Sequence, residues 1–191
     1  MKITKTYKWL TYVMLTSLVL VSICGYFYQR SPQKNIDIKG FQIELSKKEK
    51  LANATLNSIK SVLIHSSIDS LNGYHYPEND ISYYIFENNN LIFWSDNHIN
   101  IEKLDITDSI NWNFQELTNA YCITRSVTVD SRMIVAVVTL KYNYPYENEH
   151  LNNEFGTGLD LDKGVEIKKG TKTDKLAVFD TENKYLFSLD S

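Results

Sequence analysis

The residue types that most often carry out chemistry are few and scattered in this chain of 191 residues. Its four histidines share no metal-ligand spacing with one another or with Cys122, as a zinc site would require. They are His65, His75, His98 and His150. The pattern Asp160-x-Asp162-x-Gly164 begins like a calcium loop, but the third oxygen ligand and the closing glutamate are missing. We therefore expect neither a bound metal nor a cofactor.

Catalytic residues are equally hard to find in the sequence. It has no G-x-S-x-G motif, and no neighbouring residues mark Cys122 as an activated thiol. An extracytoplasmic hydrolase would need a nucleophile, a base and an oxyanion hole. Because none of these is visible in the sequence, we expect that the chain is not an enzyme.

Arg125 is an informative charged residue because it falls in phase with the apolar residues of an alternating run, from Tyr121 to Val129. A guanidinium on an otherwise apolar strand face can hold a carboxylate ligand through two hydrogen bonds. The alternative is that the apolar stem of Arg125 lies along the strand and its charged end reaches solvent at the sheet edge. Both interpretations remain open.

A second group of candidate ligand-binding residues follows an aromatic strand. Trp94, Asp96 and Asn97 could supply an aromatic wall and two polar groups of a pocket, and Tyr142 could add a second ring. Equally, Trp94 could belong to the core and residues 95–97 could form a turn. With Arg125, these four residues are the candidate ligand-binding site.

The elements that would position these residues are mainly strands. Residues 82–86 and 91–94 are aromatic and branched runs joined by asparagines, which suit a tight hairpin turn. Residues 120–144 give the strongest strand signal, with a turn at Asp130-Ser131. The strand after this turn is apolar on both faces, so we expect it at the centre of the sheet.

The remaining strands and short helices are expected in the C-terminal half. Two weak helical patterns lie at 112–117 and 146–155, and a weak strand lies at 165–167. A second hairpin, with strands at 176–179 and 185–189, closes the chain.

One long helix should precede the strands. Ser46-Lys47-Lys48-Glu49 has the pattern of a capping box, which predicts a helix beginning at Ser46 and continuing to about Ser70. Its apolar stripe recurs at helical spacing, at Ala52, Leu56, Ile59 and Leu63. Such a helix is about 35 Å long, enough to lie across a sheet or to pair with a second copy in a homodimer. Together the elements predict an α+β domain, PAS-like or CACHE-like, with an antiparallel sheet of five to six strands.

The N-terminal part of the chain has the composition of a membrane anchor. Residues 9–29 contain no charged side chain, and at about 1.5 Å per residue they would span roughly 30 Å of hydrocarbon. Three lysines precede this transmembrane helix within residues 1–8, which should therefore stay in the cytoplasm. Residues 30–43 would be a connector, and 44–191 the outer domain, so that 31–191 lie outside a bacterial inner membrane.

Two alternatives to a retained anchor place the domain outside as well. One is a cleaved signal peptide, although the apolar run is longer than usual and no A-x-A-like site comes after it. The other is a lipoprotein signal ending at Cys24, where Ile23 is bulkier than the small residue such signals have.

Composition limits the partners of the outer part. It carries 16 basic and 23 acidic residues, a net charge of −7, which argues against nucleic acid or anionic lipid. Cys24 lies in the apolar segment and Cys122 in the outer domain, so no disulfide can form within the domain.

Three segments in order resemble one family. They are Leu91-Ile92-Phe93-Trp94-Ser95-Asp96-Asn97; Leu140-Lys141-Tyr142-Asn143-Tyr144-Pro145-Tyr146-Glu147-Asn148 with Leu151 and Phe155; and Tyr185-Leu186-Phe187-Ser188-Leu189. With the preceding apolar segment, residues 40–189 are similar to the N-terminal sensor regions of bacterial membrane sensor histidine kinases. The resemblance implies a second membrane helix after the closing strand, then a dimerisation helix and an ATP-binding domain.

The chain departs from that family beyond the sensor region. It ends at Ser191, and His65 lacks the acidic residue and proline that come after a phospho-accepting histidine in the family. We therefore expect a membrane-anchored signal-sensing domain of two-component type without the kinase core. Its signal would be a small molecule or an envelope protein. The alternative is a membrane-tethered envelope interaction protein with no signalling role.

Overall fold

The computed structural model describes residues 9, 12–23, 36–76, 80–107 and 109–190. The chain forms two compact units, residues 1–35 and 36–191, which are described separately. In the first unit, residues 12–23 are helical, and the Thr16 and Ser22 hydroxyls donate to carbonyls one turn earlier. Among the described residues, no helix combines the length and the apolar character needed to cross a membrane. Residues 10, 11 and 24–29 of the expected span lie outside the described residues.

The second unit begins with the long helix α2, Ile38–His65, and the short 3₁₀ helix η1, Ile68–Leu71, comes after it. Asp37 is the N-cap of α2, and its carboxylate accepts a hydrogen bond from the Gly40 amide at 3.0 Å. The predicted start at Ser46 is therefore wrong. Ser46 lies inside the helix and its hydroxyl donates to the Gln42 carbonyl at 2.8 Å. A Ser-x-x-Glu pattern fits a helix interior as well as a cap, because serine can bond back one turn.

Five antiparallel strands form the main sheet in the order β2-β1-β5-β4-β3. Their bounds are β1 Ile81–Glu87, β2 Asn90–Trp94, β3 Asn113–Glu116, β4 Ala120–Val129 and β5 Arg132–Tyr142. Both predicted hairpins of this sheet are confirmed, and β5 is central as expected. Asn88, Asn89 and Asp130 adopt the left-handed backbone conformation in the two turns, with φ of 51°, 63° and 52°.

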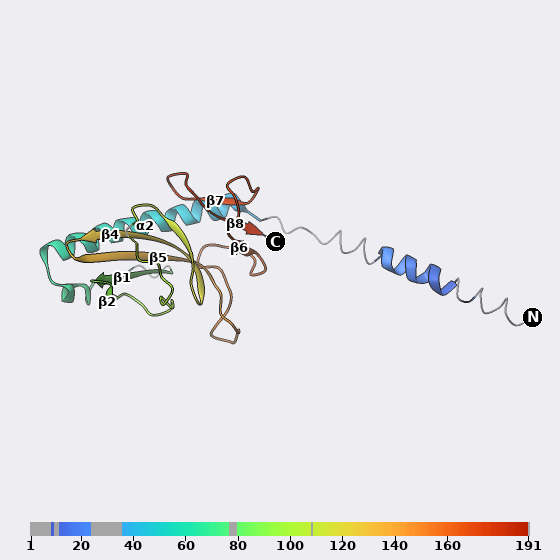
Figure 1. Cartoon of the computed structure of the whole chain (residues 1–191), viewed down its shortest axis with the longest axis horizontal. Coiled ribbons are helices and arrows are strands. Elements are labelled where there is room, and N and C mark those ends of the chain that lie inside the picture. Colours follow the sequence, from blue (N-terminus) through green and yellow to red (C-terminus); the bar gives the residue numbers. More distant parts are fainter. Residues whose placement is uncertain (1–8, 10–11, 24–35, 77–79, 108, 191) are drawn as a thin grey trace, which may run out of the picture. The chain divides into compact units, whose positions relative to one another are not determined.

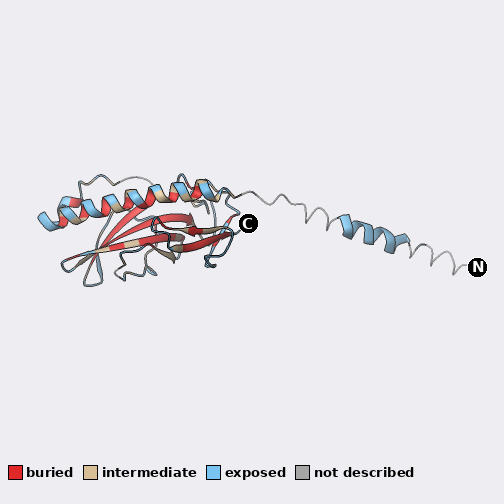
Figure 2. Ribbon diagram, turned by 90° about the horizontal axis from the view of Figure 1, so that it is seen from above, coloured by how far each residue is buried: buried red, intermediate tan, exposed pale blue. Residues whose placement is uncertain are grey.

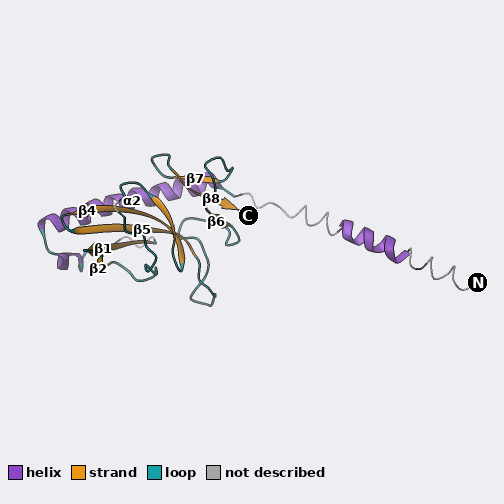
Figure 3. Ribbon diagram, in the orientation of Figure 1, coloured by secondary structure: helices purple, strands orange, loops and turns teal. Residues whose placement is uncertain are grey.

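The closing strands form a sheet of their own. It contains β6 Glu166–Lys168, β7 Ala177–Phe179 and β8 Tyr185–Asp190, in the order β6-β8-β7 (Figure 3). The α+β class and the five-stranded antiparallel sheet are confirmed, but the closing hairpin does not extend that sheet. The hairpin is instead tied to α2, where the Gln42 side chain accepts from the Phe179 amide and donates to the Phe179 carbonyl.

Side chains cover both faces of the main sheet. Helix α2 crosses one face and presents its predicted apolar stripe to the sheet, with its polar side in solvent (Figures 1 and 2). The other face is covered by the segment between β2 and β3, from which Ile99 packs against Tyr84, Cys122 and Val137. This arrangement explains why β5 is apolar on both faces, since each face meets a separate core.

The two predicted short helices are wrong. Residues 113–116 form β3, in which Phe114 lies opposite Ile123 of β4. Residues 146–155 contain no helix, because side chains replace the helical hydrogen bonds there. The Asn148 side-chain Oδ1 accepts from the backbone amides of His150 and Leu151, and the Glu147 carboxylate accepts from the Asn153 backbone amide.

Candidate ligand-binding cleft

A cleft of about 550 Å³ opens where β1 begins and β5 ends. Its lining comes from residues 74–76, 80–82, 95, 96 and 98 and from positions 139, 142 and 157. We call it the tyrosine–aspartate cleft. Its volume falls within the range of roughly 300–1,000 Å³ of small-molecule sites. Of the residues predicted from the sequence, it brings together Asp96 and Tyr142.

Asp80 joins four parts of the chain at this cleft. Its backbone is left-handed, with φ of 55°, a conformation that aspartate tolerates. Its carboxylate accepts from the Tyr142 hydroxyl at 3.0 Å and the Thr157 amide at 2.6 Å, while Lys48 Nζ of α2 lies 3.9 Å away. A Cβ at Gly156 would lie 2.6 Å from the Thr139 carbonyl oxygen, so only glycine permits this approach.

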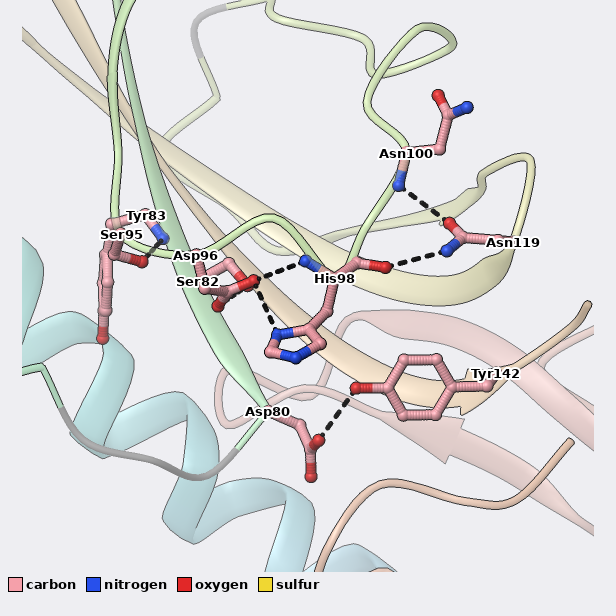
Figure 4. Close-up of polar contacts among 9 residues, drawn as sticks. All are labelled: Asp80, Ser82, Tyr83, Ser95, Asp96, His98, Asn100, Asn119 and Tyr142. Atoms are coloured by element: carbon pink, nitrogen blue, oxygen red, sulfur yellow. Dashed lines mark hydrogen bonds and ion pairs between the residues drawn. The ribbon is translucent and has the colours of Figure 1, made fainter. Parts of the chain in front are cut away.

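Asp96 is the second carboxylate of the cleft and is held by hydrogen bonds from three groups (Figure 4). The Ser82 hydroxyl donates at 2.6 Å, the His98 amide at 3.0 Å, and His98 Nδ1 lies at 3.3 Å. The Asn119 amide group braces the same loop, because it donates to the His98 carbonyl and accepts from the Asn100 amide, each at 2.8 Å. Asp96 is therefore fixed in orientation before any ligand arrives.

Aromatic rings form the remaining wall. Tyr74 and Tyr76 lie with ring centroids 4.9 Å apart, and Tyr76 also contacts Tyr83 at 5.7 Å. On the other side, Tyr142 stacks on Tyr144 at 5.7 Å with an interplanar angle of 5°. The cleft thus offers flat apolar surfaces next to two fixed carboxylates.

The hydroxyls of Tyr142 and Tyr76 are neutral donors at ordinary pH. Burial raises the pKa of Tyr142, and the negative charge of Asp80 and the hydrogen bond to it raise it further. Burial also raises the pKa of Tyr76 to about 12, with Tyr74 and Tyr83 adding to the effect. The pKa of Lys48 is lowered by burial, which outweighs the opposing attraction of Asp80. Asp80 and Glu44 thus both favour the charged form of Lys48, against the effect of burial.

The other three predicted residues lie outside the cleft. Arg125 is on the α2 side of the sheet, where its guanidinium lies 3.5 Å from the Glu182 carboxylate. Trp94 ends β2 and is 53 % exposed, so its assignment to the core is wrong. Asn97 is exposed between Asp96 and His98. None of these three residues lines the cleft.

Several lining residues were not predicted from the sequence. Tyr74 and Tyr76 come after the turn at Asn72-Gly73. Two aromatic residues in a short polar loop are the sequence feature that could have predicted their place in a binding site. Asp80 immediately precedes a strand and gives no such signal. Its role depends on Tyr142 and Thr157, which are 62 and 77 positions away in the sequence.

Metal and thiol chemistry find little support elsewhere in the structure. In the described parts of the chain, no group of three or more His, Cys, Asp or Glu residues is placed to hold a metal ion. Cys122 is a buried free thiol, and burial raises its pKa to about 12, which keeps it protonated and unreactive. No family model, curated protein sequence or solved structure matches the chain.

Proposed function

We propose that this chain is the extracytoplasmic, PAS-like or CACHE-like input domain of a membrane-anchored sensor of two-component type, and that the tyrosine–aspartate cleft receives its signal. The observation that carries the proposal is Asp80, whose carboxylate links the cleft to helix α2 through Lys48. Residues 1–8 would lie in the cytoplasm and 31–191 outside the inner membrane. Signalling would require the kinase core to be supplied downstream or by a partner.

The same contact suggests how ligand binding would be transmitted. A ligand that attracts the Asp80 carboxylate weakens its interaction with Lys48, whose side chain is 8 % exposed. Weakening this attraction changes the electrostatic balance of a buried ammonium group, which would favour an arrangement in which α2 has shifted relative to the sheet. Because α2 is the first element of its unit, the shift would reach the segment that precedes it in the chain. A ligand acts in this way only if it binds one of the two arrangements better.

The proposal is tested by thermal unfolding of the full chain in detergent against neutral, cationic and anionic metabolites and oligosaccharides. A ligand present at a hundred times its Kd adds about 2.7 kcal/mol, or a rise of about 5–10 °C in Tm. We expect such a rise to be lost in Asp96→Asn and retained in Tyr146→Phe, a change at an exposed tyrosine outside the cleft. A folded chain whose Tm moves with none of these compounds would contradict direct ligand sensing.

A second candidate function, a tethered envelope interaction protein, is favoured by strand β2. One edge of β2 pairs with β1, and in the described part of the chain the other edge has no strand partner. Leu91, Ile92 and Trp94 on this strand are exposed, and the strand carries no charge to protect its edge. A photo-crosslinking residue at Ile92 would capture an envelope protein in cells if this function is correct, and none if β2 is only a sheet edge.

Dimerisation along α2 remains part of the first proposal. Ile43 and Ile64 are apolar residues of α2 that face solvent, with 58 % and 54 % exposure. A disulfide formed between two chains carrying Ile64→Cys would support parallel pairing of this helix.

A further inference from the structure

The charge of the tyrosine–aspartate cleft limits what can bind there. Among the described residues that line it, the carboxylates of Asp80 and Asp96 are the acidic groups, and no Lys or Arg side chain is present. Lys48 approaches Asp80 from α2, on a side chain that is almost fully buried. An anionic ligand would lose its hydration in the cleft without gaining an opposite charge. The lining therefore selects against anions.

The two carboxylates retain capacity to accept hydrogen bonds. An ionised carboxylate has about four lone-pair positions. Among the described residues, Asp80 accepts hydrogen bonds from the Tyr142 hydroxyl and the Thr157 amide. Asp96 accepts hydrogen bonds from the Ser82 hydroxyl and the His98 amide. These partners fix the carboxylates without neutralising them, apart from the 3.9 Å approach of Lys48 to Asp80. A positively charged donor would gain from both groups at once.

The tyrosine rings complete a site for a cation. Aromatic faces carry negative charge density and attract ammonium groups, most strongly where water is excluded. Tyr76 is half-buried and clusters with Tyr74 on one side of the cleft, and Tyr142 lies on the other. The Tyr76 and Tyr142 hydroxyls stay protonated, so these two rings add no full charge of their own.

We propose that the tyrosine–aspartate cleft binds a small organic ammonium ion, with Asp80 and Asp96 as counter-charges and the tyrosine rings as its walls. This inference rests on the proposed ligand-sensing function and specifies its ligand class. Ammonium binding at Asp80 would compete directly with Lys48, so that recognition of the cation and displacement of α2 occur at one carboxylate.

The test compares each cation with a neutral molecule of the same shape. Choline is paired with 3,3-dimethyl-1-butanol, and ethanolamine with 1-propanol, by calorimetry on the full chain in detergent. The assay is run at the same pH, 8, for both members of each pair. At 0.15 M salt, screening removes long-range attraction to the acidic surface.

We expect at least one cation to bind at least tenfold more tightly than its neutral partner. Asp96→Asn should abolish that preference, whereas Asp160→Asn, at an exposed aspartate outside the cleft, should preserve it. Because Asp80 also supports the fold, its charge is probed by salt: cation affinity should fall as salt rises and neutral affinity should not.

Equal binding of a cation and its neutral partner would overturn the ammonium inference and leave ligand sensing intact. The absence of binding by both cations at 10 mM would also overturn it. In that case, the broader thermal screen decides whether the cleft senses another ligand class.

Discussion

At the scale of single residues, the cleft is held together by polar side chains that each satisfy several partners. Asp80 is the clearest example, because it bonds Tyr142 of β5 and the Thr157 amide and lies near Lys48 of α2. A hydrogen bond to a charged acceptor contributes about 1.5–3 kcal/mol, more than one between neutral groups. Such a residue influences both the stability of the fold and the shape of the site.

The Tyr142 hydroxyl provides a direct measure of this contact. Tyr142→Phe keeps the ring and its stacking on Tyr144 but removes the hydrogen bond to Asp80. We expect a loss of about 1.5–3 kcal/mol in the free energy of unfolding, measured by urea denaturation. The matched change Tyr146→Phe, at an exposed ring, should cost less than about 0.5 kcal/mol. Equal effects of the two changes would show that the bond contributes nothing.

At the scale of elements, α2 is one of the elements that connect the two sheets. Its Gln42 side chain bonds the backbone of Phe179 in β7, and the Glu49 carboxylate accepts from the Thr181 amide at 2.9 Å. Gln42 and Glu49 are about two helical turns apart, so both side chains point from the same side of α2 toward the β7–β8 hairpin. The start and the buried side of α2 therefore decide how the small sheet is attached.

The start of α2 can be checked at its two competing caps. Asp37→Ala removes the side chain that accepts from the Gly40 amide, and we expect it to cost about 1 kcal/mol. Ser46→Ala removes only a hydroxyl that bonds back to Gln42 within the helix, and its effect should stay within about 0.5 kcal/mol. Urea denaturation of both variants distinguishes the caps. A larger cost at Ser46 would place the functional cap there, as the sequence pattern suggests.

The contact between α2 and the β7–β8 turn should depend on pH. Burial raises the pKa of Glu49, and the nearby Asp180 adds to this, against the Thr181 hydrogen bonds and the charge of Arg125. Because the folded pKa lies above the unfolded one, the stability from Glu49 is complete at low pH. It is lost as pH rises through the folded pKa, and the loss is about 1.4 kcal/mol for each pH unit that separates the two pKa values.

Glu49→Gln should remove this dependence, since an amide cannot ionise and its oxygen can still accept the hydrogen bond from the Thr181 amide. We expect the free energy of unfolding of the variant, relative to the natural chain, to increase between pH 4 and pH 8. Urea denaturation across that range gives the difference. A difference that stays constant with pH would show that Glu49 has the same protonation in both states.

At the scale of the whole molecule, the sequence predicts those features of the fold that depend on residues close together in the chain. The β1–β2 and β4–β5 hairpins were predictable because the turn residues Asn88, Asn89 and Asp130 and the apolar alternation are local. The separation of β6, β7 and β8 into another sheet depends on contacts with α2 more than a hundred positions away, such as Gln42 with Phe179. The same distinction between local and distant contacts applies to the cleft. Asp96 and Tyr142 were found at strand ends, whereas Asp80 gains its role only through distant partners.

The topology of the full chain is the remaining whole-molecule prediction, and the chemistry of Cys122 makes it measurable. That thiol is buried and its pKa is raised to about 12, so it should not react with a membrane-impermeant maleimide. In a Cys24→Ser background, Lys169→Cys supplies an exposed thiol in the second unit, and Lys2→Cys places a thiol before the apolar segment. With the outer envelope permeabilised, position 169 should be labelled in intact cells and position 2 only after lysis.

Labelling in the opposite order would contradict the proposed orientation. Loss of position 2 from the mature chain would show that the apolar segment is a cleaved signal, which removes the route from α2 to the cytoplasm.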